Sequence, residues 1–63
     1  MKYLVVYDLE TKKNTAKICN EDDVADIVDY ARFLKAKNII VYIVDFENEL
    51  ISEVFRDEES IDN

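Results

Sequence analysis

The sequence predicts a small α+β domain of ββαββ order, with one helix packed on one face of a four-stranded antiparallel sheet. Its 63 residues are enough for a single domain and no more. Two segments, one at the start of the chain and one past its middle, have the alternating or continuous apolar character of strands. Between them, apolar residues recur at the spacing of one helix face. Together these three observations define the fold class.

The first strand is expected over Lys2–Glu10, where β-branched and aromatic residues alternate. A polar turn at Thr11–Asn14 should follow, with Asn14 in the left-handed conformation, since the chain contains no Gly. Thr15–Cys19 is expected as a short edge strand, which Lys17 protects from pairing with other chains. The first strand divides its apolar residues between two faces: Tyr3, Val5, Tyr7 and Leu9 on one, Leu4 and Val6 on the other.

The helix is expected to begin after Asn20, a favourable N-cap residue, and to run to about Ala36. Acidic residues fill its first turns and basic residues its end, as the helix dipole favours. Tyr30 and Phe33 are expected to flank the apolar stripe. That stripe consists of Val24, Ile27, Val28, Ala31 and Leu34.

Asn38–Phe46 is the most apolar strand, which predicts that both of its faces are covered. A hairpin turn at Glu47–Glu49 is expected, with Asn48 in the left-handed position. Leu50–Arg56 follows as a more polar fourth strand. Residues 1–56 then form one domain, and Asp57–Asn63 is expected to be a frayed acidic tail.

The two most apolar strands belong in the middle of the sheet, which gives the strand order 2-1-3-4. A β-grasp-like order, 2-1-4-3, would put the more polar fourth strand in the centre. One helix covers only one face of four strands, so an apolar face is left for a partner or a second copy. That face should carry Leu4 and Val6 with one of two sets from the third strand: Ile40, Tyr42 and Val44, or Ile39, Val41 and Ile43.

Charge is distributed unevenly along the chain. Residues 45–63 hold eight acids and one base, which account for the whole net charge of −7, while residues 1–44 balance. A negative protein repels nucleic acid and anionic membranes and attracts basic surfaces. No targeting signal or transmembrane run is expected, and Cys19 has no cysteine partner. We therefore expect a cytoplasmic protein that binds neither nucleic acid nor membrane directly.

The residue types argue against an enzyme. The chain has no His for acid–base catalysis at neutral pH and no Gly for a phosphate-binding loop. Cys19, near several acids, should be a poor thiolate. Asp45, Glu47 and Glu49 place oxygen ligands at alternate positions, but the segment lacks the Gly and the later Glu of a calcium loop. We expect no catalytic residue, no cofactor and no metal.

The predicted topology brings the start of the helix and the second hairpin turn to one end of the sheet. A second acidic feature is a stripe along the exposed helix face. The acids at the helix start and those at the hairpin turn each also have a local explanation, because acids suit helix starts and solvated turns. The candidate partner-binding residues are Glu21, Asp22, Asp23, Asp45, Glu47 and Glu49 at the end of the sheet, and Asp22, Asp26 and Asp29 in the stripe.

Two functions fit these features. The first is a small acidic interaction module that binds a basic, nucleic-acid-binding protein. Inhibitors from phages and mobile elements, including DNA mimics, have this size and charge, by analogy rather than by motif. The alternative is a structural domain that forms a homodimer through the uncovered apolar face, with its acids serving solubility.

Overall fold

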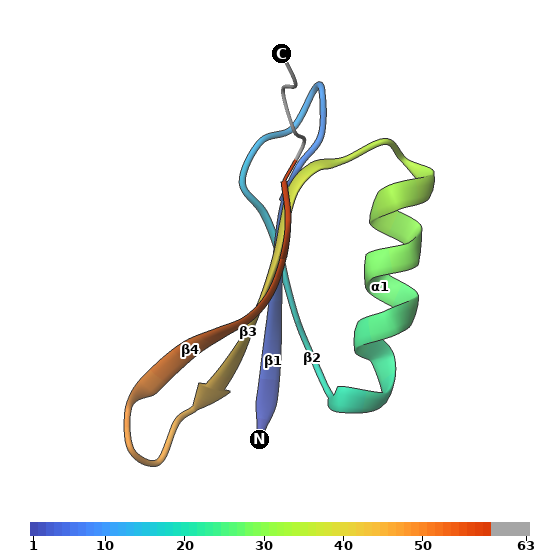
Figure 1. Cartoon of the computed structure of the whole chain (residues 1–63). Coiled ribbons are helices and arrows are strands. Elements are labelled where there is room, and N and C mark those ends of the chain that lie inside the picture. Colours follow the sequence, from blue (N-terminus) through green and yellow to red (C-terminus); the bar gives the residue numbers. More distant parts are fainter. Residues whose placement is uncertain (59–63) are drawn as a thin grey trace.

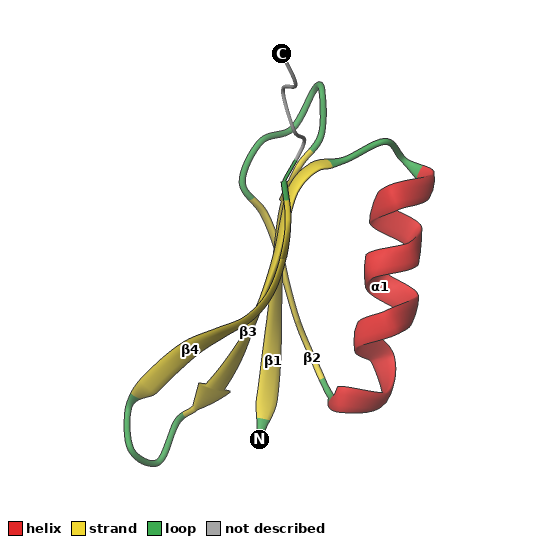
Figure 2. Ribbon diagram, in the orientation of Figure 1, coloured by secondary structure: helices red, strands yellow, loops and turns green. Residues whose placement is uncertain are grey.

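The computed structural model describes residues 1–58 and confirms the predicted fold. Four antiparallel strands form one sheet in the order β2-β1-β3-β4, and the single helix lies along one side of it (Figure 1). The β-β-α-β-β order of elements is followed readily in Figure 2. The elements are β1 Lys2–Asp8, β2 Thr15–Cys19, α1 Glu21–Phe33, β3 Lys37–Asp45 and β4 Leu50–Asp57.

The core lies between α1 and the two central strands. Ala31 is fully buried, and its small side chain lets the helix approach the sheet closely. Because Val5 and Val41 are paired neighbours and both are buried, they identify the face that the helix covers. The alternative left open by the sequence is thereby settled: Ile40, Tyr42 and Val44 lie on the uncovered face. The buried core consists of Val5, Tyr7, Val28, Ala31, Ile39 and Val41.

Asp8 holds two turns together at one end of the sheet. Its Oδ1 accepts the backbone N–H of Asn14 at 2.8 Å, and its Oδ2 accepts Nδ2 of Asn38 at 3.2 Å. Both asparagines have φ of 57°, so the left-handed conformation expected for Asn14 is confirmed. These hydrogen bonds, chiefly that from Asn14, hold the pKa of Asp8 below its ordinary value. One carboxylate thus stabilises the β1–β2 turn and the start of β3.

The helix ends at Phe33, three residues before the predicted end. Lys35 adopts a φ of 64°, and its N–H donates to the carbonyl of Arg32 at 2.9 Å. The N–H of Ala36 donates to the carbonyl of Ala31 at 2.9 Å. This is the Schellman pattern, which ordinarily has Gly at the left-handed position. The chain has none, so Lys35 takes it.

The edge strand β4 contains a bulge. Val41 pairs with Phe55 and Tyr42 pairs with Glu53, which leaves Val54 as the extra residue. The strand extends to Asp57, whose carboxylate pairs with Arg32 of α1 at 3.0 Å. The frayed tail predicted for the end of the chain falls largely on residues 59–63, which lie outside the described residues.

We expect Ile39→Val to lower the free energy of unfolding by about 0.5–1.5 kcal/mol, because it removes a methylene from the packed core. Ile39 is 2% exposed. The matched control is Leu50→Val, which also removes one methylene, since Leu50 is 61% exposed on the edge strand β4. Urea unfolding followed by circular dichroism compares the two variants. An equal loss of unfolding free energy in the two variants would contradict the assignment of Ile39 to the core.

The Asp8→Asn substitution should destabilise the protein in a pH-dependent way. The folded pKa of Asp8 lies below its ordinary value of 3.8, so its ionised form is stabilised by folding. That contribution is fully present above the ordinary value and is lost as the pH falls through the lowered folded pKa. The stability difference between wild type and variant should therefore be largest at neutral pH and shrink in acid. Urea titrations over a pH series measure it; a constant difference would refute the role given to the carboxylate.

Candidate functional site

The acidic residues predicted to meet at one end of the sheet form two separate groups there. β2 and β3 both end at this end, α1 and β4 both begin there, and the first residues of β1 lie between (Figure 1). Lys2, in β1, donates from Nζ to Oδ1 of Asn20 at 2.8 Å. The helix-start group and the turn group therefore share one end of the sheet but lie on either side of the start of β1. The first group is Glu21, Asp22 and Asp23; the second is Asp45, Glu47 and Glu49.

Asp45 is engaged in organising its own turn. Its Oδ1 accepts the backbone N–H groups of Glu47 at 3.1 Å and Asn48 at 3.2 Å, and its Oδ2 accepts Nδ2 of Asn48 at 2.9 Å. The Asn48 side-chain amide, followed by its backbone N–H, lowers the pKa of Asp45. The prediction that Asn48 takes the left-handed conformation is wrong: Glu49 has the φ of 57°. Asn48 serves the turn through its side chain instead.

Asn20 precedes the helix but does not cap it with its side chain. Its carboxamide oxygen is used by Lys2 instead. Cys19, beside it, is half-buried, and burial first and the nearby Asp23 second raise the pKa of its thiol. A raised pKa keeps the thiol protonated at neutral pH, which makes it a weak nucleophile.

The outward surface of α1 carries a row of carboxylates that ends in two aromatic rings. Asp22, Asp26 and Asp29 are exposed and, within residues 1–58, make no hydrogen bond or ion pair. Phe33 is 78% exposed and Tyr30 is 55% exposed. Their rings stack with centroids 6.4 Å apart. We call these five residues the outer helix face.

The exposed aromatic pair is the part of this surface that the sequence interpretation missed. The sequence predicted that Tyr30 and Phe33 flank the apolar stripe of the helix. At 3.6 residues per turn, however, Phe33 falls in line with Asp22, Asp26 and Asp29, opposite the buried residues of the helix. The spacing of 4, 3 and 4 residues along this line was the signal that could have found it.

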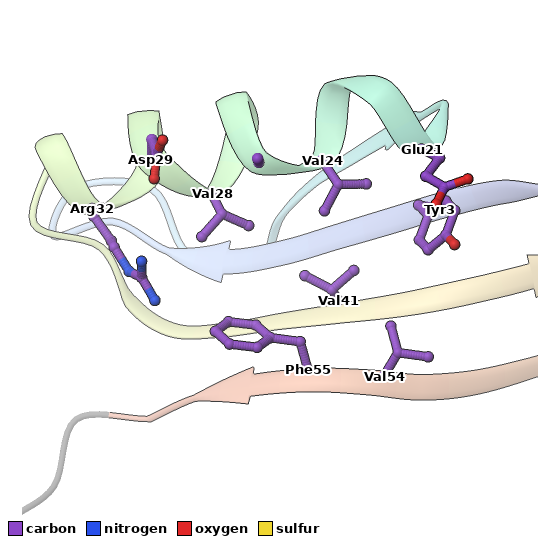
Figure 3. Close-up of a pocket in the computed structure, with 10 residues that line it drawn as sticks. Tyr3, Glu21, Val24, Val28, Asp29, Arg32, Val41, Val54 and Phe55 are labelled. Carbon is purple, nitrogen blue, oxygen red and sulfur yellow. The ribbon is translucent and has the colours of Figure 1, made fainter.

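A shallow groove of about 430 Å³ runs between α1 and β4. Figure 3 shows Asp29 and Arg32 on its helix wall, with Val54 and Phe55 on the opposite wall. The Arg32 guanidinium lies 5.8 Å from the centroid of the Phe55 ring and pairs with Asp57. The groove is therefore largely apolar and ends in an ion pair, and it offers no nucleophile beside a base.

Across residues 1–58, no group of three or more His, Cys, Asp or Glu side chains is placed to hold a metal ion. In that same part of the chain, no helix has the length and apolar character needed to span a membrane. Comparisons with protein-family models, with curated proteins and with solved structures gave no match.

Proposed function

We propose that this chain is a protein-interaction module that binds a basic, nucleic-acid-binding protein through the outer helix face. The observation that carries the proposal is the row of Asp22, Asp26 and Asp29 leading into the exposed Tyr30–Phe33 pair. A solvated helix face needs no exposed aromatic pair, whereas Tyr and Phe at the centre of an interface supply much of its binding energy.

Both parts of this surface suit the same partner side chains. Carboxylates pair with Lys and Arg, and aromatic rings attract the same cations through their faces. The arginines of the chain are engaged elsewhere: Arg32 pairs with Asp57, and Arg56 pairs with Glu53 and Glu58. The carboxylates of the outer helix face are thus available to cations from another protein.

The spacing of the carboxylates favours a partner that ordinarily binds phosphates. At 1.5 Å of rise per residue, Asp22 to Asp29 spans roughly 10 Å, or about one negative charge per 5 Å. A DNA strand carries one charge per about 3.4 Å. A basic groove built for nucleic acid would therefore meet a row of comparable, slightly sparser charge. An inhibitor that occupies such a groove, as phages and mobile elements encode, is the form of module we favour.

The net charge of −7 supports the same proposal. A protein with this imbalance is steered toward positive surfaces over about a Debye length, roughly 8 Å at physiological salt. Binding should therefore be fast and should weaken as salt is added. The groove beside Arg32 could receive an apolar side chain of the same partner, because Asp29 belongs both to the groove wall and to the outer helix face.

Removing the three aspartates should weaken capture of basic proteins by about tenfold. Each exposed ion pair contributes about 0.5 kcal/mol, and 1.4 kcal/mol is tenfold in affinity. The test variant carries Asp22→Asn, Asp26→Asn and Asp29→Asn. The comparison variant carries Glu10→Gln, Glu47→Gln and Glu49→Gln, which changes the net charge equally and distinguishes the outer helix face from the turn group to which Glu47 and Glu49 belong. Immobilised proteins capture partners from a bacterial lysate at rising salt, and mass spectrometry identifies them.

We expect captured proteins to be enriched in basic nucleic-acid-binding proteins and to be released by salt. A captured set without basic bias, or one indifferent to salt, would overturn the function. An equal loss of captured protein in the two triple variants would overturn the assignment of partner binding to the outer helix face. Phe33→Ala should also weaken capture, whereas Phe46→Ala, at a residue 64% exposed near the β3–β4 turn, should not.

A further inference from the structure

The face of the sheet opposite α1 is apolar across β2, β1 and β3, and Ile51 extends it onto β4. Side chains on this face alternate with those that the helix covers, so the strand registers identify them. One row across the sheet runs from Ile18 through Leu4 to Tyr42, and the next runs from Ala16 through Val6 to Ile40. Val44 and Ile51 form a pair toward the β3–β4 turn. We call this surface the open sheet face: Leu4, Val6, Ala16, Ile18, Ile40, Tyr42, Val44 and Ile51.

The open sheet face is close to neutral, unlike the chain as a whole: Lys2 and Arg56 stand against Asp8, Glu53 and Glu58, which leaves one negative charge, since Arg56 pairs with both glutamates. Arg56 pairs through its guanidinium with Glu53 at 2.7 Å, because the bulge brings these two residues to the same face. Lys2 lies at one end of the face and Asp8 at the other, where Asp8 is already bonded to two asparagines. Two copies of a protein with a net charge of −7 would repel through most surfaces. The open sheet face is the surface on which two copies can meet with little repulsion.

The edges of the sheet are less suited to pairing than this face. β2 is only five residues long and carries Lys17, and β4 has the bulge at Val54. Short strands, edge lysines and bulges are the devices that natural sheets use to prevent edge-to-edge pairing. Two protected edges beside an unprotected apolar face favour stacking of sheets over extension of one sheet.

The size of the face fits a modest dimer interface. Four strands spaced about 4.8 Å apart and about six residues long present roughly 400 Å² in plan. The accessible area of a surface covered in side chains exceeds its plan area. A standard protein–protein interface buries about 800 Å² per partner. The area of this face therefore lies between that of weak, transient interfaces and that of standard ones.

We infer that the open sheet face binds a second copy of this chain. The two sheets would stack about 10 Å apart, with the helices outside, in a four-layer αββα arrangement. The outer helix faces then point away from the interface, and one dimer displays two of them. This inference stands independently of the proposed partner, since the two surfaces lie on opposite sides of the sheet.

Sedimentation equilibrium over a concentration series tests the inference on the whole chain. The wild type should sediment as a dimer at high micromolar concentration, and Ile51→Lys should raise its dissociation constant at least tenfold. The matched control is Leu50→Lys: Leu50 is 61% exposed and Ile51 is 55% exposed, on opposite faces of the same strand. Ile18→Lys, on the far edge, gives a second disruption, and circular dichroism verifies that each variant is folded.

A monomeric wild type at the highest concentration would overturn the inference and leave the face to a different protein. A dimer weakened by Leu50→Lys but not by Ile51→Lys would also overturn it, because the interface would then lie on the helix side. Added salt should strengthen the dimer by screening the repulsion between acidic copies. The same salt should weaken binding to a basic protein, so the two proposals can fail separately.

Discussion

One helix packed on four strands is the constraint on which the rest of this structure depends. Val28 and Ala31 of α1 lie against the covered face of β1 and β3 and bury Val5 and Val41. A helix about 10 Å wide leaves much of a four-stranded sheet uncovered. The groove beside β4 and the exposure of nearly all of that strand follow from this mismatch. So does the bare apolar face on the other side of the sheet.

The charged residues are distributed differently on the two sides of the sheet. Within residues 1–58, carboxylates without an internal partner line the outward surface of α1, while the open sheet face is close to neutral because Arg56 offsets part of the charge of Glu53 and Glu58. An evenly acidic surface would have kept the protein soluble without this separation. The separation gives the molecule one surface suited to cations and another suited to apolar contact, on opposite sides of the sheet. Asp8 and Asp45 have a different role, because their carboxylates are engaged in holding turns.

The topology could be predicted from the sequence because the strands differ in hydrophobicity, and the most apolar strands occupy the centre of a sheet. The unbroken apolar run of β3 and the alternation in β1 required central places, and the sheet order followed. The face of β3 that the helix covers could not be predicted, since both faces are apolar. The helix end and the left-handed residue of the second turn were assigned wrongly for a shared reason: without Gly, the left-handed positions fell to Lys35 and Glu49, which have no strong preference for them. Tyr30 and Phe33 were assigned by residue type, although their helical angle points to solvent.

The claim that the two sides of the molecule serve different contacts is tested most directly by NMR with a soluble paramagnetic probe. Ile18 of the open sheet face and Ala25 of α1, which lines the groove beside β4 on the opposite side of the sheet, are both accessible in the single chain. At high micromolar concentration, the Ile18 methyl groups should be shielded from the probe and should become accessible on dilution. The Ala25 methyl should remain accessible throughout. Equal relaxation of both residues at every concentration would contradict the account.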